Sequence, residues 1–351
     1  MYKLVETNWK KVALVDMLTE PSKLFSELTK KTILKYKKTW KKILFITNRK
    51  WYASWNLCLD CWFVPKCENC DVPIAKYYKK TDWFLNEDAE FIYMCPICKK
   101  HYSSNLSCPN CWWFNIKEVG IWTYKLQEIL KKEFNLEVFV VENTQVNSLN
   151  KIKKIKDQLS SSNFVISTWI LSVESKYFKP DIIIFPNADT GLSVPDFNSA
   201  EKHFLSLYEL IKNYSTENYI IQTYNFDNFV YQNLLHLDLE WFWKKELEFR
   251  KKLNYPPYEE IALLLYKHEI EEKLYLKISK LEKELKYLVE KNNQTISIYP
   301  TPQLVYKKFG KYHYNIILKW KKLKSFLDLI DRTLRIRNKW FQIDYLPNSL
   351  I

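Results

Sequence analysis

The sequence contains very little glycine. Only Gly120, Gly191 and Gly310 occur among 351 residues, whereas glycine averages about 7% of residues in proteins. This scarcity excludes the loops GxxxxGK[ST] and GxGxxG, which hold phosphates and dinucleotides, because both need glycines at fixed spacings. It also forces residues with a Cβ into turns that require a positive φ, where such residues are strained.

The chain also lacks the signatures of membrane insertion, secretion and common hydrolases. It has no run of about 18 uncharged apolar residues. The first residues, MYKLVETNWKK, lack the apolar segment and cleavage site of a signal peptide. HExxH, GxSxG and a DEAH-type acidic box are absent, and the five histidines form no cluster. We therefore expect a cytoplasmic protein without a membrane partner, and no motif assigns a catalytic residue.

Basic residues and hydrophobic residues are plentiful. Lys and Arg total 54 against 40 Asp and Glu, which gives a net charge of +14, and 47% of residues are hydrophobic. The hydrophobic content can fill two or three cores in a chain of this length. Because the lysines are spread along the chain instead of forming one tail, the charge favours a nucleic acid partner over a merely lysine-rich composition.

All eight cysteines occur as CxxC pairs, which is typical of structural zinc sites. Each pair supplies two thiolates from one tight turn, so four pairs make two tetrahedral sites with four cysteine ligands each. Disulfides are not expected in a cytoplasmic chain, and redox chemistry would need one pair only. The pairs are Cys58/Cys61, Cys67/Cys70, Cys95/Cys98 and Cys108/Cys111.

The gaps between the pairs allow sequential, crossed or nested arrangements. Residues 74–94 between the second and third pairs alternate enough to form a hairpin, which would bring these two pairs together. The outer pairs then meet. The predicted ligands are Cys58, Cys61, Cys108 and Cys111 for one zinc, and Cys67, Cys70, Cys95 and Cys98 for the other. Four-ligand sites leave no open position for water, so both metals should be structural.

Strands and helices alternate around the cysteine-rich segment. We expect strands at 43–47, 136–142, 163–168, 181–187 and 218–225, and helices at 121–134, 146–161 and 199–214. This alternation predicts a parallel α/β sheet into which the cysteine-rich segment is inserted.

The last third of the chain follows a different pattern. Residues 239–260 read as a linker, because Pro256 and Pro257 stop any helix. After it we expect the strand 261–269, the helix 271–291, the strands 295–300 and 311–320, the helix 322–336 and the strand 341–346. The order βαββαβ suggests a split β-α-β domain with its helices on one face.

Several segments together resemble the primosomal protein N′ (PriA) family of replication-restart DNA helicases. They are ILFITNRKWYA, the four CxxC pairs, NADTGLSVPDFNSAEKHF, IIQTYN, ELEFRKKLNYPPYEEIALL and KKFGKYHYNIILK. The resemblance covers essentially the whole chain. It implies an α/β fold: a RecA-like second helicase lobe interrupted by a two-zinc cysteine-rich insertion, followed by a smaller α+β domain that binds DNA. The family's pairing of outer and inner knuckles supports the nested scheme.

The departures from the family fall on the ATPase parts. The family's first half, with its phosphate-binding loop and acidic magnesium box, has no counterpart here. The motif GTQMxxKG corresponds to residues 167–174 without its basic residue, and no arginine lies between Phe204 and Gln222, where the family has its arginine-finger motif. Since a helicase neutralises the transferring phosphate with arginine, we expect this polypeptide alone not to hydrolyse ATP. ATP and magnesium are implied only together with a separate N-terminal half.

The resemblance also predicts a division of the chain and its partners. Residues 1–56 would begin the second helicase lobe, 57–113 form the zinc insertion, 114–235 complete the lobe, and 236–351 form the linker and DNA-binding domain. The implied partners are forked or single-stranded DNA, other primosome proteins and single-stranded-DNA-binding protein. The alternative is a non-enzymatic, zinc-stabilised DNA-binding protein derived from the family. Apart from the resemblance, the expected DNA contacts are Arg49 and three lysines that flank Gly310 in a basic loop, Lys307, Lys308 and Lys311. The alternative is that these lysines form a solvated turn.

Tryptophan stands where the family has glycine at several motif positions. Trp51, Trp62, Trp112 and Trp122 are such positions, and the chain has 14 tryptophans. A bulky side chain just past a zinc knuckle would be strained wherever φ is positive. We therefore hypothesise that UGA codons read as glycine in the source lineage were translated as tryptophan. The alternative is genuine enrichment, for instance as platforms for base stacking.

Overall fold

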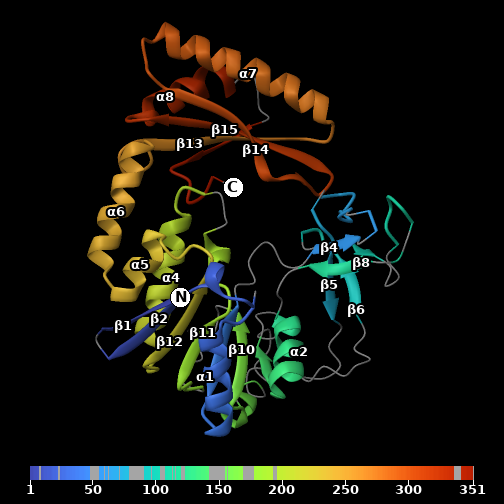
Figure 1. Cartoon of the computed structure of the whole chain (residues 1–351). Helices are drawn as coiled ribbons and strands as arrows, with labels where there is room; N and C mark the ends of the chain where they lie inside the picture. Colours follow the sequence, from blue (N-terminus) through green and yellow to red (C-terminus); the bar gives the residue numbers. More distant parts are fainter. Residues whose placement is uncertain are drawn as a thin grey trace.

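The computed structural model describes most of the chain. The described residues are 1–7, 9–22, 24–47, 55–58, 60–61, 63–70, 72–78, 91–95, 97–102, 107–112, 114, 116–119, 123–141, 155, 157–168, 178–192, 196–335 and 341–350. Three parts are visible in Figure 1: a large α/β core, a cysteine-rich module beside it, and a C-terminal unit above both. No helix among the described residues is long and apolar enough to cross a membrane.

The α/β core is built on a seven-stranded sheet with the order β1-β2-β12-β11-β3-β10-β9. Only β1 and β2 pair antiparallel, and all other pairs are parallel. The parallel strands are short and apolar, as expected for strands covered on both faces. The strands are β1 (Tyr2–Thr7), β2 (Lys10–Asp16), β3 (Ile43–Thr47), β9 (Phe139–Val141), β10 (Phe164–Thr168), β11 (Ile182–Phe185) and β12 (Asn218–Thr223).

Helices cover both faces of this sheet (Figure 1). In β3, Ile43 and Phe45 pack with α1 and α2, whereas Leu44 and Ile46 pack with α4, α5 and α6 on the opposite face. This alternation is the period of two that a strand buried on both faces requires. The helices are α1 (Glu27–Lys38), α2 (Thr123–Phe134), α4 (Ser199–Asn213), α5 (Phe229–His236) and α6 (Leu239–Lys252).

The cysteine-rich module is inserted between β3 and α2. It contains a two-stranded sheet, β4-β8, and a three-stranded sheet, β5-β6-β7. The pairing of β5 with β6 is antiparallel and confirms the hairpin predicted between the second and third CxxC pairs. The strands are β4 (Trp55–Cys58), β5 (Ala75–Tyr78), β6 (Phe91–Met94), β7 (His101–Tyr102) and β8 (Ile116–Val119).

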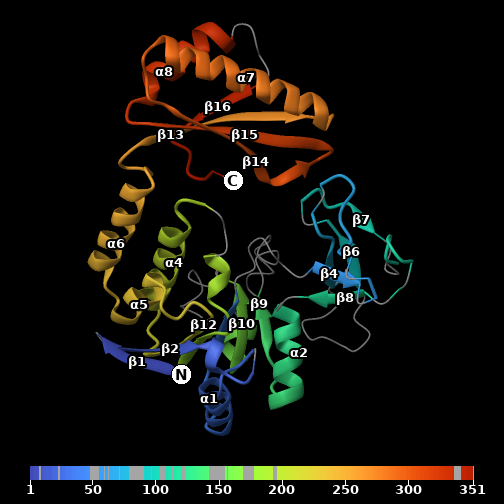
Figure 2. The same ribbon diagram turned by 45° about the horizontal axis from the view of Figure 1, so that its top comes forward.

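The C-terminal unit is a four-stranded antiparallel sheet with the order β14-β15-β13-β16. Both of its helices lie on one face (Figure 2), where Leu274 and Phe326 pack against Ala262 and Leu264 of the central strand. The element order is the βαββαβ order expected from the sequence. The elements are β13 (Glu260–His268), α7 (Glu271–Lys291), β14 (Ser297–Lys308), β15 (Lys311–Trp320), α8 (Leu323–Ile330) and β16 (Phe341–Tyr345).

The segment expected to be a linker instead begins as a helix. Residues 239–252 form α6, which starts at the N-cap Asp238 and ends before Pro256. The ring of Phe242 stacks on Phe204 with 3.8 Å between centroids, so α6 belongs to the α/β core. The prolines do stop a helix, but fourteen residues of helix precede them. Burial of Phe242 was not visible from the local sequence.

The C-terminal unit contacts both of the other parts. The last residues of the chain reach the α/β core, where the Ser349 hydroxyl and the Leu350 N–H donate to the Asp196 carboxylate at 2.6 and 3.1 Å. At the other end of the sheet, the β14–β15 turn reaches the cysteine-rich module, and the Gly310 N–H donates to the Asn69 carbonyl at 2.8 Å. The C-terminal unit therefore bridges the α/β core and the module.

Most of the remaining expectations on secondary structure agree with the structure. The strand at 43–47, the helix at 271–291 and the strand at 311–320 have the predicted bounds. The helix expected at 146–161 falls largely outside the described residues, although 157–161 are helical. The β1–β2 hairpin and α1 were not predicted.

Candidate metal centres and basic face

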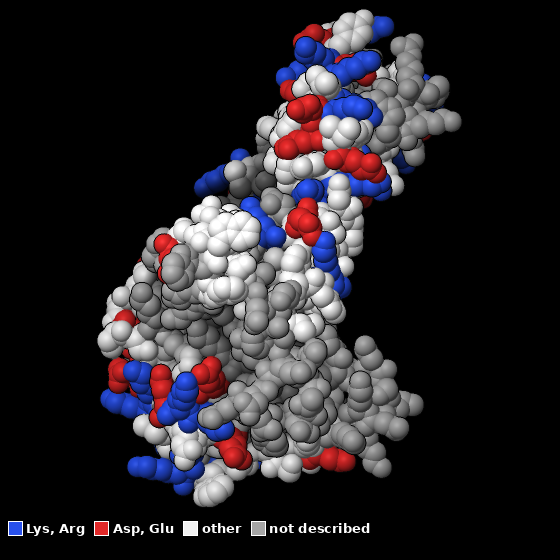
Figure 3. All heavy atoms as spheres, turned by 90° about the vertical axis from the view of Figure 1, so that its right-hand side faces the viewer, with Lys and Arg blue, Asp and Glu red and all other residues white. Residues whose placement is uncertain are grey.

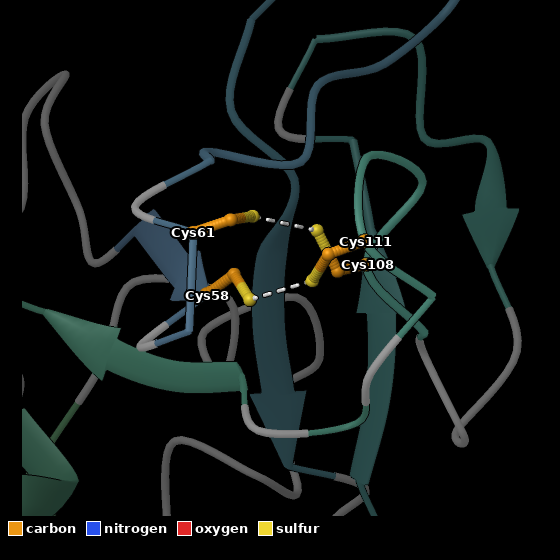
Figure 4. A group of neighbouring side chains, drawn as sticks. All are labelled: Cys58, Cys61, Cys108 and Cys111. Atoms are coloured by element: carbon orange, nitrogen blue, oxygen red, sulfur yellow. Dashed lines mark hydrogen bonds between the residues drawn. The ribbon is translucent and has the colours of Figure 1, made fainter.

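The outer CxxC pairs converge on one point in the module. Cys58 and Cys61 come from the end of β4 and the turn after it, and Cys108 and Cys111 lie shortly before β8. Because β4 pairs with β8, and Cys58 is the register partner of Ile116, the two knuckles face each other (Figure 4). The Sγ atoms of Cys58 and Cys111 lie 3.5 Å apart, as do those of Cys61 and Cys108.

The inner pairs meet through the β5–β6 hairpin. Cys67 and Cys70 precede β5, and Cys95 and Cys98 follow β6, with 3.7 Å between the Sγ atoms of Cys67 and Cys98. Apolar side chains enclose this quartet, among them Ile74 and Tyr93. Each of the two quartets has all four Sγ atoms within 4.8 Å of one another.

A repeated backbone hydrogen bond shapes the knuckles. The N–H of the first cysteine donates to the carbonyl of the residue that follows the turn, in Cys58 to Phe63, in Cys67 to Val72 and in Cys95 to Lys100, at 2.8 to 2.9 Å. These bonds close tight loops that hold both thiols of a pair on the same side, as in metal knuckles generally.

The geometry of both quartets fits zinc. Four sulfur ligands at about 2.3 Å from a tetrahedral zinc lie about 3.8 Å from one another, close to the 3.5 to 3.7 Å separations found here. A disulfide would need a sulfur separation of about 2.05 Å, and all eight cysteines are free. Each site is closed by four thiols, so a metal bound there would be structural. The histidine nearest in sequence, His101, is exposed and belongs to neither quartet.

The thiols within each quartet differ in acidity when no metal is bound. A hydrogen bond from Asn110 lowers the pKa of Cys61 to about 6, whereas burial raises the pKa of Cys95 to about 12. Burial opposes ionisation of Cys98, but hydrogen bonds from Lys100 and the neighbouring thiols lower its pKa to about 7. Each quartet thus holds a thiol that ionises readily, and thiolates are the form that binds zinc.

The lysines expected to contact DNA separate onto two faces of the C-terminal sheet. Lys308 and Lys311 are register partners, and Lys307 is the partner of Tyr312. Since Tyr312 packs against the core beneath the helices, Lys307 lies on the helix-covered face, with its ammonium donating to the Glu68 carbonyl at 3.0 Å. Lys308 and Lys311 lie on the opposite face. Arg49 lies outside the described residues.

Two residues that the sequence did not single out join Lys308 and Lys311. Lys267 of β13 is the register partner of His313 on β15. Burial is the largest effect on the pKa of His313 and lowers it. A backbone hydrogen bond at Lys308 raises this pKa, and the positive charges of Lys308, Lys267 and Lys311 lower it further. We call Lys267, Lys308, Lys311 and His313 the basic face. One acidic neighbour, Glu269, lies 3.3 Å from Lys311.

On one side of the molecule the charges of the described residues are mixed. On the side drawn in Figure 3, lysines and arginines of the described residues alternate with acidic side chains over both the C-terminal unit and the α/β core. The basic face is therefore a local cluster of positive charge and a candidate contact with nucleic acid.

Comparison with known proteins gives relatives along nearly the whole chain. The replication restart protein PriA of Borreliella burgdorferi is 26% identical over 99% of this chain and 52% of its own length. PriA of Bacillus subtilis is 25% identical over 97% of this chain and 43% of its own length, and PriA of Thermotoga maritima 25% over 93% and 43%. No family model matches the chain.

The chain spans about half the length of these curated relatives. The match is consistent with a C-terminal portion of them. The resemblance that the motifs indicate is therefore confirmed: along nearly its whole length, this chain is homologous to the replication restart protein PriA.

Proposed function

We propose that this chain is a DNA-binding component of replication restart and primosome assembly whose cysteine-rich module holds two structural zinc ions. The observation that carries the proposal is the homology to PriA over 99% of the chain, together with two closed cysteine quartets. In this proposal the α/β core is a RecA-like second helicase lobe, the module is its zinc insertion, and the C-terminal unit binds DNA.

The ligands would be those of the two quartets. Cys58, Cys61, Cys108 and Cys111 would bind one zinc, and Cys67, Cys70, Cys95 and Cys98 the other. Zinc contributes folding energy where small modules lack a sizeable apolar core. The module has short strands, and its apolar cluster is built around the inner cysteines. Metal binding would therefore determine whether the module folds.

The basic face would bind the phosphate backbone of DNA. Lys267, Lys308 and Lys311 bring like charges together around His313, an arrangement that an anionic ligand would relieve. Phosphate contacts carry no sequence information, and each releases counterions. Binding should thus be sensitive to salt and insensitive to base sequence. Arg49 and Lys307 remain candidates from the sequence, although Lys307 already contacts Glu68.

The experiment is a salt titration of DNA binding by fluorescence anisotropy, with forked and single-stranded oligonucleotides. Replacing Lys308 and Lys311 together by glutamine should weaken binding to all sequences alike. It should also flatten the slope of log K against log salt by about 0.7 to 0.9 for each phosphate that is no longer neutralised. Lys324→Gln is the matched control, because Lys324 is exposed on α8, across the sheet from the basic face. An unchanged slope in the double variant would exclude the basic face.

Binding of a phosphate beside His313 should also raise the pKa of that histidine. A nearby anion favours the protonated imidazolium, whereas in the free chain burial and the surrounding lysines lower the pKa. NMR titration of the histidine ring in free and DNA-bound protein measures this change directly.

Helicase activity would require the ATP-binding half of the family in addition to the residues described here. The family's ATP and magnesium sites lie in its first half, and the segment between Phe204 and Gln222 has no arginine to neutralise a transferring phosphate. These residues would act either together with that half, within an assembly that includes other primosome proteins and single-stranded-DNA-binding protein, or as a non-enzymatic DNA-binding protein. DNA-stimulated ATP hydrolysis by a mixture with the product of a neighbouring helicase-half gene distinguishes the two. Hydrolysis favours the first, and its absence favours the second.

A further inference from the structure

Three tryptophans have a left-handed backbone. Trp9, Trp40 and Trp112 have φ of 71°, 54° and 65°. For a bulky L-residue this region brings the Cβ close to the neighbouring carbonyl oxygen and is a genuine outlier. The same three side chains are 85%, 78% and 75% exposed. Burial of the indole therefore offsets little of the strain.

Trp40 occupies the glycine position of a helix C-terminal motif. After α1, the Trp40 N–H donates to the Lys37 carbonyl and the Lys41 N–H to the Tyr36 carbonyl, which are the two bonds of a Schellman motif. The same pair of bonds ends α6 at Asn254 and α7 at Asn293, both at positive φ. Glycine is the usual residue at this position and asparagine the accepted substitute.

Trp9 and Trp112 occupy two other positions of the same kind. Thr7 pairs with Lys10, so Trp9 belongs to the two-residue connection of the β1–β2 hairpin. The sequence of this connection is Asn-Trp, and Asn-Gly is the dipeptide that such turns favour most. Trp112 follows the last knuckle, where its N–H donates to the Cys108 carbonyl at 2.8 Å. Three unrelated motifs thus present tryptophan at a left-handed position.

The other tryptophans that the structure describes do not share this backbone. Trp241, Trp243 and Trp320 lie within α6 and β15, and none of them has a positive φ. Base-stacking platforms would be expected to line one surface. The β1–β2 hairpin, α1 and the cysteine-rich module instead lie in separate places (Figure 1).

We propose that Trp9, Trp40 and Trp112 are encoded by UGA codons that the source cell reads as glycine, so that the native protein has glycine at all three positions. UGA differs by one base both from the tryptophan codon UGG and from the glycine codon GGA. A gene from such a lineage, translated with UGA as tryptophan, acquires tryptophan at its glycine positions. A low glycine count and a high tryptophan count, 3 and 14 in this chain, are what such a translation produces.

The direct test is peptide sequencing by mass spectrometry of the protein made by the cells that carry the gene. Glycine at positions 9, 40 and 112 is the expected result, with UGA at each codon of the gene. Tryptophan at any of the three positions would overturn the proposal.

A second test uses the chain produced with tryptophan at every one of these positions. Trp40→Gly should lower the unfolding equilibrium constant about fivefold, because relief of left-handed strain exceeds the extra freedom of glycine in the unfolded chain. Trp241→Gly is the matched control inside α6 and should raise that constant, since glycine weakens a helix interior. No stabilisation by Trp40→Gly would count against strain at this position.

A different observation concerns the inner quartet. The β14–β15 turn covers the second knuckle. Gly310 donates to the Asn69 carbonyl, Lys307 donates to the Glu68 carbonyl, and the Phe309 backbone hydrogen-bonds the Cys70 thiol. A hydrogen-bond donor to a metal-ligating sulfur stabilises the thiolate form of that sulfur. Hydrogen bonds to ligands therefore tune the affinity of a site for its metal. All three contacts of the turn lie at the second knuckle, which belongs to the inner quartet.

We infer, on the basis of the proposed zinc sites, that this turn is a positioning element for the inner metal, so that seating of the C-terminal unit and retention of the inner zinc depend on each other. Gly310→Pro removes the N–H that binds Asn69 and also displaces the turn, because proline cannot adopt the φ of 76° that Gly310 has. Lys307→Met removes the ammonium. In the double variant, release of one of the two zinc ions to a colorimetric chelator should accelerate about 10- to 100-fold. The other zinc should leave at the parent rate and serves as the internal control.

The outcomes separate this inference from the proposed function. A parent protein that holds no zinc would contradict the metal sites themselves. A parent with two zinc ions, and a variant that releases both at the parent rates, would overturn the coupling alone.

Discussion

Acidification should destabilise the chain through one buried histidine in the α/β core. His203 of α4 is 4% exposed, and its Nε2 lies 3.2 Å from the Tyr231 hydroxyl. Because that hydroxyl donates to the Asp189 carboxylate at 3.0 Å, His203 is the donor to Tyr231. Gly191 lies against the same ring, since a Cβ at Gly191 would overlap it.

The size of the effect follows from the pKa of His203. Burial lowers it to about 4 against a weaker raising effect of Asp189, whereas an unfolded histidine titrates near 6.5. Between these values the unfolded chain binds more protons than the folded chain, so the contribution to stability is complete above about pH 6.5 and is lost as the pH falls to about 4. At about 1.4 kcal/mol per pKa unit, the loss is about 3 kcal/mol.

The measurement compares urea unfolding of the parent and of His203→Gln at several pH values from 7 to 4. Loss of metal and protonation of carboxylates affect both proteins, so the difference between their pH dependences isolates His203. The parent should lose up to about 3 kcal/mol more than the variant, and His236→Gln, at an exposed histidine of α5, should follow the parent. Parallel curves for the parent and His203→Gln would refute the reasoning.

Three further substitutions test individual contacts of the chain. Asp196→Ala removes the acceptor of Ser349 and Leu350. It should lower the free energy of unfolding in urea by about 2 to 3 kcal/mol and speed proteolysis of the last residues. Unchanged stability and unchanged proteolysis would contradict the contact. Gly191→Ala places a Cβ against His203 and should cost about 1 to 3 kcal/mol by the same assay, whereas a neutral effect would show that the ring moves freely. Glu269→Gln removes the acid beside Lys311 and should tighten DNA binding about twofold at low salt, and weaker binding would argue against the basic face.

The parts of the fold that were predictable are those whose signal is local. The strand at 43–47 and the helix at 271–291 carry continuous apolar runs or apolar residues at helical spacing, and both have the predicted bounds. The nested cysteine quartets were predictable because a hairpin leaves few ways to bring four knuckles together. Its strands β5 and β6 do pair.

The elements that the sequence did not predict depend on contacts between residues distant in the sequence, or on a turn that lacks the usual glycine. β1 is an edge strand with mostly exposed side chains, and its turn carries Trp9 where glycine would have marked a hairpin. α6 resembles a linker because prolines follow it, and only the stack of Phe242 on Phe204 shows that it belongs to the core.

The basic face needed the strand register. Lys267 and His313 are far apart in the sequence and become neighbours because β13 pairs with β15. Register also separates Lys307 from Lys308, which stand side by side in the sequence but on opposite faces of the sheet. Sequence proximity alone grouped the three lysines of the β14–β15 turn.

Counting the zinc ions held by the intact chain tests the central claim most directly. Native mass spectrometry of protein purified without chelator should show two zinc ions per chain. It should show one zinc in Cys108→Ser, one in Cys95→Ser, and none when both are replaced, because the two residues belong to different quartets. A parent chain without zinc, or a single variant that loses both ions while the remaining quartet stays folded, would contradict the account.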